Sequence, residues 1–114
     1  MFRRMVALCA AVLLSLTLST TPASAEPLFV SYRAHVQNVG WQPFVPTPGT
    51  AGTTGQSLRL EAVRVRSDVP GWKIECQAHV QNVGWMPWVG DGETCGTTGR
   101  SLRLEAIRLR LVEA

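Results

Sequence analysis

The sequence has little that would support catalysis, and it contains only one long apolar run. Of its 114 residues, three are cysteine and two are histidine, and no Ser/His/Asp or Cys/His arrangement stands out. The apolar run, at residues 6–18, is too short for a comfortable membrane span, and no second run follows it. These shortages argue against a triad enzyme and against a protein that crosses a membrane repeatedly.

The N-terminal segment has the layout of a secretory signal peptide. A basic start with two arginines precedes the apolar run, and a small-x-small cleavage site follows at residues 23–25. We therefore expect residues 1–25 to be removed and the mature chain to be secreted, either free outside the cell or associated with the cell surface. A retained membrane anchor and lipidation at Cys9 are the weaker alternatives.

Removal of this segment changes both the charge and the cysteine count. Nine basic and eight acidic residues remain, so the formal net charge falls to +1. A chain so close to neutral has no broad electrostatic attraction for nucleic acid or anionic lipid. The two remaining cysteines, Cys76 and Cys95, are an even pair in a small secreted domain, which predicts one disulfide.

The main feature of the chain is an internal repeat. Residues 34–66 match residues 78–110 without a gap, and 23 of these 33 positions are identical. A period of 44 residues is typical of repeat folds. The repeat predicts four parts, which are a signal peptide at 1–25, a first repeat at 26–66, a linker or turn at 67–73 and a second repeat at 74–114.

The cysteines allow a test of this repeat. Tyr32 and Ala51 are the first-unit counterparts of Cys76 and Cys95. If the two units share a fold, a large tyrosine and a small alanine should pack together where the second unit has its disulfide.

Each unit contains three stretches that are typical of strands. In the first, which begins near Val30, apolar and polar residues alternate, as expected for a strand with one buried face. The second, at residues 41–45 and 85–89, contains a proline, which predicts a position at a sheet edge. In the third, the apolar residues change parity between Ala62 and Val63, which predicts a β-bulge, with a helix as the alternative.

These elements predict an all-β fold. We expect two tandem three- to four-stranded units, related by a pseudo-twofold and packed around one hydrophobic core. The apolar residues of the third stretch, from Leu102 to Leu111 in the second unit, are expected to face that core. Because two units leave sheet edges open, a homodimer or a further unit is expected to cover them.

Two aromatic residues recur in each unit, three positions apart. They are Trp41 and Phe44 in the first unit, and Trp85 and Trp88 in the second. In a regular strand this spacing places them on opposite faces, with one in the core and one in solvent. Their simplest role is to anchor the core, but an exposed ring could stack on a sugar or anchor a protein partner.

A Gly-Thr-Thr-Gly turn also recurs, at residues 52–55 and 96–99. It is most simply a connector into the third strand, although its N–H groups and hydroxyls could also serve a ligand. It is not a phosphate-binding loop, since no lysine and no helix follow it.

The remaining recurring polar residues are His35 and His79 on the polar parity, and Glu61 and Glu105 between arginines. Cross-strand ion pairs on a solvated face explain the glutamates, and a structural hydrogen bond explains the histidines. Neither a metal site nor a hydrolase with two carboxylates is expected.

The segments A-H-V-Q-N-V-G-W, Gly-Thr-Thr-Gly and S-L-R-L-E-A-[VI]-R-[VL]-R together resemble the clostridial hydrophobic repeat named for its tryptophan, the ChW repeat. Two copies would cover residues 30–66 and 74–111, with the naming tryptophan at Trp41 and Trp85. The resemblance implies a secreted or surface protein of Gram-positive type whose tandem repeats bind substrate or other proteins without catalysis. The first unit lacks the Asp-Gly of the second in the turn after the second strand, which argues against equal binding by both units.

We therefore expect a secreted, non-catalytic binding module for cell-surface glycan or extracellular polysaccharide, without metal or other cofactor. A protein–protein interaction module at the cell surface is the main alternative, and a small hydrolase is a weaker one. The candidate ligand-binding residues are Trp41, Phe44, Trp85, Trp88, Thr53, Thr54, Thr97 and Thr98.

Overall fold

The computed structural model describes residues 29–114, so the expected signal peptide lies outside the described residues. No helix in this part of the chain is long and apolar enough to cross a membrane. The described residues form eight strands and no helix, so the all-β prediction is confirmed and the helix alternative for the third stretch is wrong. The strands are β1 (Val30–Val36), β2 (Gly40–Trp41), β3 (Val45–Pro46), β4 (Leu60–Ser67), β5 (Trp72–Val80), β6 (Gly84–Trp85), β7 (Thr94–Gly96) and β8 (Leu104–Glu113).

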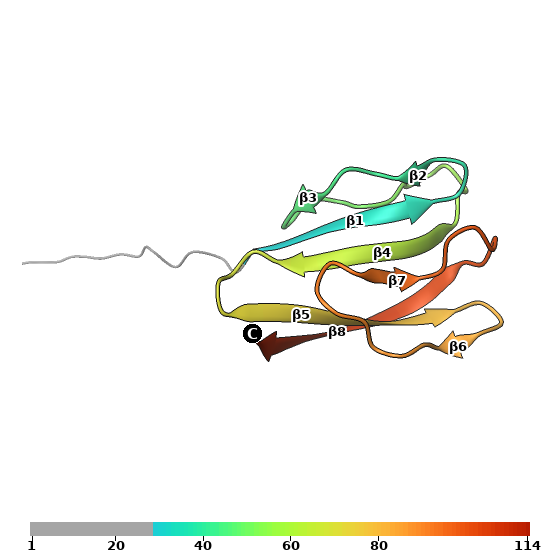
Figure 1. Cartoon of the computed structure of the whole chain (residues 1–114). Coiled ribbons are helices and arrows are strands. Elements are labelled where there is room, and N and C mark those ends of the chain that lie inside the picture. The colour runs from blue at the N-terminus through green and yellow to red at the C-terminus, as the bar shows by residue number, and fades with distance from the viewer. Residues whose placement is uncertain (1–28) are drawn as a thin grey trace, which may run out of the picture.

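The strands form two sheets, and each sheet is built on one long antiparallel pair of strands (Figure 1). These pairs, β1 with β4 and β5 with β8, are called the hairpins of the two units, although a long segment joins the strands of each pair. In the first sheet the order is β2-β1-β4-β7, and β3 also pairs with β1. In the second the order is β6-β5-β8. A tight turn joins the two hairpins, and the N–H of Trp72 donates to the carbonyl oxygen of Val69 at 3.2 Å within it.

Both hairpins carry the predicted bulge. Between Leu60 and Ala62, which both have ladder partners in β1, Glu61 has none. The second unit skips Glu105 in the same way. The extra residue lies just before the predicted position between Ala62 and Val63, and it changes which side chains face the core.

The predicted second strand of each unit is divided by its proline. In the first unit, β2 and β3 both pair with β1, and residues 42–44 between them are outside the ladder. In the second unit, β6 is followed by a single bridge between Val89 and Cys76. The predicted edge position is confirmed, and the interruption follows because proline has no N–H to donate to a ladder.

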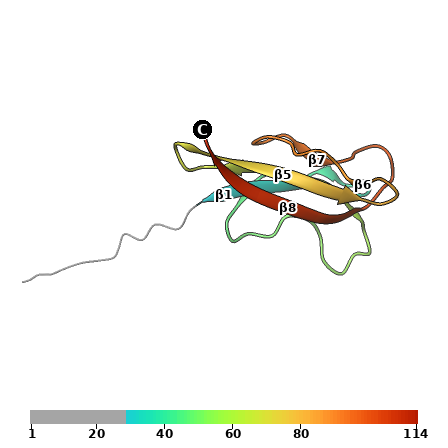
Figure 2. The ribbon, with the colours of Figure 1, turned by 90° about the horizontal axis from the view of Figure 1, so that it is seen from below.

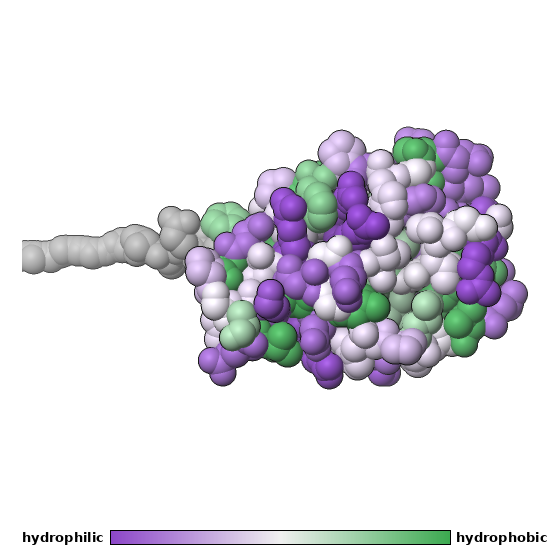
Figure 3. All heavy atoms as spheres, in the orientation of Figure 1, coloured by the Kyte–Doolittle hydropathy of each residue, from purple (hydrophilic) through white to green (hydrophobic). Residues whose placement is uncertain are grey.

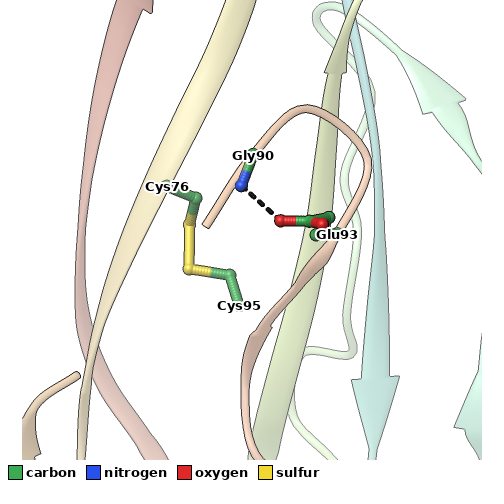
Figure 4. The surroundings of a disulfide bond; sticks show 4 residues. All are labelled: Cys76, Gly90, Glu93 and Cys95. Atoms are coloured by element: carbon green, nitrogen blue, oxygen red, sulfur yellow. Dashed lines mark hydrogen bonds between the residues drawn. A yellow bond between two sulfur atoms is a disulfide. The ribbon is translucent and has the colours of Figure 1, made fainter. Parts of the chain in front are cut away.

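One strand crosses from the second unit to the first. β7 pairs with β4, with Val63 opposite Cys95, although it belongs by sequence to the second repeat. The predicted disulfide between Cys76 and Cys95 is present and links β7 back to β5, with the two Cα atoms 6.1 Å apart (Figure 4). β7 is therefore bound to both sheets, to β4 through a ladder and to β5 through the disulfide.

The contact between the units has no reciprocal counterpart. By the repeat, residues 50–52 correspond to β7, and residues 106–108 of β8 correspond to the part of β4 that β7 covers. A twofold relation would pair these two segments, but the ladders of the described residues do not include that pair. Figure 2 shows the loops of the two units leaving the ribbon on opposite sides, with β8 crossing between them. One edge of β8 is therefore free within the described residues.

The core lies between the two sheets and includes both units. Its buried members are Val63, Val65, Ile74, Cys76, Ala78, Val80 and Cys95. The predicted alternation of the first stretch is confirmed in β5 and largely in β1. Ser31 is the exception, because it is buried while its hydroxyl donates to the carboxylate of Asp68.

Most apolar side chains of β8 lie outside this core, although Leu104 packs against it. Val63 and Val65 of β4 are 9% and 5% exposed, whereas their counterparts Ile107 and Leu109 are 40% and 46% exposed. The expectation that this stretch faces the core is therefore wrong for Ile107, Leu109 and Leu111. β4 is covered by β5 and β7 of the second unit, and no strand among residues 29–114 covers β8 in the same way.

The exposed residues of β8 border an open apolar groove between the sheets, with a volume of about 390 Å³. Tyr32 and Ala51 line the same groove, and the Tyr32 hydroxyl donates to the carbonyl oxygen of Gly49. In the first unit, the hydrogen bond from Tyr32 to the loop thus replaces the disulfide of the second unit.

Candidate binding face

We call the outer face the side of each sheet that bears the polar parity, opposite the core. Each unit places the same kinds of residue there, from its two long strands and from the irregular segment between them. In the first unit these are Arg33, His35, Trp41, Phe44, Glu61, Arg64 and Arg66, and in the second they are Gln77, His79, Trp85, Trp88, Glu105, Arg108 and Arg110.

The carboxylate of the bulge contacts a histidine and an arginine in each unit. Nδ1 of His35 lies 2.9 Å from Oε1 of Glu61, and Nε of Arg59 donates to Oε2 at 2.8 Å. In the second unit, Nδ1 of His79 lies 3.0 Å from Oε1 of Glu105, whose other oxygen accepts from an arginine at 2.8 Å. The bulge makes this possible because it turns an otherwise core-parity glutamate outward toward the histidine.

The same histidine contacts the tryptophan of the repeat. His35 and Trp41 lie opposite each other in the β1–β2 ladder, with ring centroids 5.1 Å apart and an interplanar angle of 80°. His79 and Trp85 have the same separation and an angle of 81°. Each tryptophan is therefore held edge-to-face by a histidine that is itself fixed by a carboxylate.

Arginines lie over the aromatic rings on the outer face. The guanidinium carbon of Arg33 is 5.0 Å from the centroid of Trp41 and 4.9 Å from that of Phe44. One arginine reaches both rings, so the prediction that these aromatics lie on opposite faces is wrong. The proline between them breaks the ladder and with it the strict alternation. In the second unit, Arg108 lies 4.0 Å from Trp85, and another arginine lies 4.0 Å from Trp88.

The two units differ in how open this cluster is. Trp41 has two arginines near its ring, Arg33 and Arg64, whereas Gln77 replaces the first of these beside Trp85. Trp85 is 40% exposed, and Trp41 is more buried. The open copy of the cluster is therefore in the second unit.

The Thr-Thr turns are not equally accessible. Thr97 is buried where the end of β7 meets β4, and its N–H donates to the carbonyl oxygen of Glu61 at 3.3 Å. Thr98 and Thr54 are exposed, and Thr53 is half-buried. In the first unit the turn lies next to the tryptophan, since the N–H of Gly52 donates to the side-chain oxygen of Gln42 at 2.8 Å.

The outer face presents aromatic rings, guanidinium donors and carboxylate acceptors, which contact one another in each unit. Among residues 29–114 no three His, Cys, Asp or Glu side chains are grouped as metal ligands would be. Over the face seen in Figure 3, hydrophilic side chains are interspersed with small hydrophobic patches. Sequence reasoning identified the tryptophans as candidates, but it did not foresee their histidine, carboxylate and arginine partners as one cluster.

Two hairpin units of the same repeat, joined by a shared ladder and a disulfide, define an all-β tandem-repeat domain. The chain matches the family Clostridial hydrophobic W (ChW) over residues 35–67 and 79–113, with one match in each unit. The chain belongs to this family and carries two tandem copies of its repeat, as the sequence resemblance predicts. No curated protein and no solved structure matches it.

Proposed function

We propose that this chain is a non-catalytic extracellular module that binds a cell-surface glycan or extracellular polysaccharide through its outer face. The observation that supports this is the duplicated cluster of tryptophan, histidine, glutamate and arginine. Its two copies agree within 0.1 Å in the histidine–glutamate distance and have the same ring separation. A sugar offers a C–H face to an aromatic ring and hydroxyls to charged groups around it, which this cluster supplies together.

Trp85 is the stronger platform of the two. Its ring is more exposed than that of Trp41, and Glu105 and Arg103 beside it keep their polar atoms near solvent. The first-unit carboxylate, Glu61, is buried and thus less available to a ligand. Binding should therefore depend more on the second unit.

A protein partner is the second candidate, and the apolar groove favours it. The groove and the outer face lie on opposite sides of β8, because Ile107 and Leu109 alternate with Arg108 and Arg110. A large exposed apolar surface is typical of a docking site for protein. The two candidates can thus be separated by mutating one side of the strand.

The first prediction tests the outer face with two equally exposed tryptophans. Trp85→Ala removes the proposed platform. Trp72→Ala removes a ring that is 44% exposed but borders an apolar hollow next to the groove, away from the outer face. In fluorescence titrations of the mature protein with cell-wall glycans and soluble polysaccharides, Trp85→Ala should weaken binding at least tenfold, about 1.4 kcal/mol. Trp72→Ala should bind as the unmodified chain does.

Thermal melts of both variants show whether the fold is retained. No saturable signal with any glycan, from folded protein, would contradict the proposal. Loss of binding in Trp72→Ala alone would instead place the ligand in the groove.

A further inference from the structure

We propose that the apolar groove is filled by a second copy of this chain. In this dimer each copy lays residues 50–52, the donor segment, along residues 106–108 of its partner's β8, the acceptor edge. The proposal does not depend on glycan binding, because the apolar side chains that the dimer would bury lie on the side of β8 that faces away from the outer face.

The chain already contains the template for this pairing. Within one molecule, β7 of the second unit pairs with β4 of the first, and Val63 lies opposite Cys95. By the repeat, Ile107 is the second-unit counterpart of Val63, and Ala51 is the first-unit counterpart of Cys95. The equivalent pairing between two copies therefore places Ile107 of one opposite Ala51 of the other. The equivalent edge in the first unit, on β4, therefore already pairs with such a segment.

The acceptor edge has apolar surface that a partner would bury. Ile107 and Leu109 are at least four times as exposed as their first-unit counterparts, and Leu111 is 50% exposed. The groove continues into an apolar hollow of about 320 Å³ beside Phe29 and Trp72 at one end. At the other end it continues between β4 and β8. A continuous apolar surface of this kind is unusual on a monomer.

The glycine of the donor segment has nearly the same φ as its counterpart in β7, but without the close neighbour found there. Gly96 has φ of +110°, and a Cβ there would lie 2.7 Å from the carbonyl oxygen of Glu61. Gly52 has φ of +107°, yet the nearest atom to a Cβ there is a methyl of Leu60 at 3.9 Å. The donor segment thus has open space beside Gly52 where Gly96 of β7 lies against β4.

Side chains of the template recur as well. Nε of Arg64 donates to the hydroxyl of Thr94 at 3.0 Å across the β4–β7 ladder. Arg108 and Thr50 are the same residue types at the corresponding positions, so they would meet across the proposed interface. The donor and acceptor segments therefore carry counterparts of both template pairs, the apolar pair at Ala51 and Ile107 and the polar pair at Thr50 and Arg108.

The arrangement favours a closed dimer over an open chain of molecules. Ala51 of the donor segment and Ile107 of the acceptor edge line the same groove. Two copies that face each other across this groove satisfy both pairings at once and leave neither edge of the interface free. Closed twofold assemblies of this kind are the commonest homo-oligomers, and they remove exposed strand edges.

The dimer contact should be weaker than the internal one. The internal ladder includes the N–H of Gly92, which donates to the carbonyl oxygen of Val65 at 2.8 Å, and Asp91, which accepts from two backbone N–H groups. Their first-unit counterparts are Pro48, which has no N–H, and Thr47, which has no carboxylate. Association should therefore be reversible and depend on concentration.

The second prediction is tested by the mass of the mature protein over a concentration series, by light scattering and sedimentation. The unmodified chain should pass from the mass of one chain to that of two. Ile107→Lys should weaken this at least tenfold, about 1.4 kcal/mol, and Leu109→Lys should do the same. Arg110→Lys, on the outer side of the same strand, should leave the dimer unchanged. Both apolar positions are exposed in one chain, so the folded state should tolerate lysine, which circular dichroism checks.

The pairing itself is tested by cross-linking. Chains carrying Ala51→Cys are mixed with chains carrying Ile107→Cys and treated with a short bismaleimide. The mixed product should exceed both like-with-like products. A single-chain mass at every concentration, or a product dominated by Ile107→Cys chains joined to each other, would overturn the proposal. Either result would leave the glycan proposal untouched.

Discussion

Identical residues have different surroundings in the two units, and the glutamates of the bulges show this most clearly. The Glu61 side chain is 7% exposed and that of Glu105 is 30% exposed, although both contact a histidine and an arginine at nearly the same distances. The cause is the end of β7, where Gly96 and the following residue Thr97 lie against the backbone of Glu61. The expectation of a solvated ion pair therefore holds for Glu105 and is wrong for Glu61.

The third prediction follows from this difference. Glu61→Gln keeps the shape of the side chain but removes the charge that Arg59 and His35 contact in a buried position. It should lower the free energy of unfolding by about 1.5–3 kcal/mol, the range for hydrogen bonds to charged groups. Glu105→Gln, on the exposed copy, should lower it by about 0–1 kcal/mol. Urea unfolding of both variants measures the difference, and equal losses would contradict the role given to β7.

At the scale of the element, local rules explain the long strands better than the short ones. Alternation predicts β1 and β5, and the change of apolar parity predicts the bulge at Glu61. The short segment after β2 departs from a strand because Pro43 interrupts its ladder, so a period of two no longer places Phe44. The contact of Arg33 with both aromatics depends on this interruption.

The fourth prediction concerns the two equivalent glycines, Gly96 in β7 and Gly52 in the donor segment. Both have a positive φ, so alanine at either position adds backbone strain of about 1–2 kcal/mol. Only Gly96→Ala also drives a Cβ into the backbone of β4, which should cost about 1–3 kcal/mol more. Denaturant unfolding at low protein concentration compares the two variants as single chains.

Equal losses in the two variants would mean that β7 does not approach β4 closely. At high concentration, Gly52→Ala should also weaken the proposed dimer, because the acceptor edge would then meet the added Cβ.

At the scale of the whole molecule, the two units are held together asymmetrically. β7 and the disulfide between Cys76 and Cys95 connect the second sheet to β4, and nothing equivalent runs from the first unit to β8 within the described residues. The molecule thus has one completed junction and one open one. The open junction carries the apolar groove, and the opposite side of the sheets carries the aromatic clusters.

The fifth prediction tests the closed junction. Replacing both Cys76 and Cys95 by serine removes a cross-link between residues 19 apart, worth about 3 kcal/mol in the chain-entropy model. The melting temperature should then fall by on the order of 10–20 °C for a domain of this size. Tyr32→Phe, which removes only the first unit's hydrogen bond to Gly49, should cost about 1 kcal/mol. A similar fall in both variants would show that the disulfide does not carry the junction.

The repeat, the all-β class, the disulfide and the positions of the long strands could all be predicted from the amino-acid sequence. These properties follow from local patterns, which are side-chain alternation, a change of parity, turn residues and an even pair of cysteines. The sequence did not determine that β7 pairs with β4, that Glu61 is buried, or that Ile107 and Leu109 of β8 remain exposed. Two nearly identical repeats present nearly identical patterns, so no local signal separates the third strand that is covered, β4, from the one that is exposed, β8. The difference arises in the tertiary structure, because burial depends on which neighbour lies beside each strand.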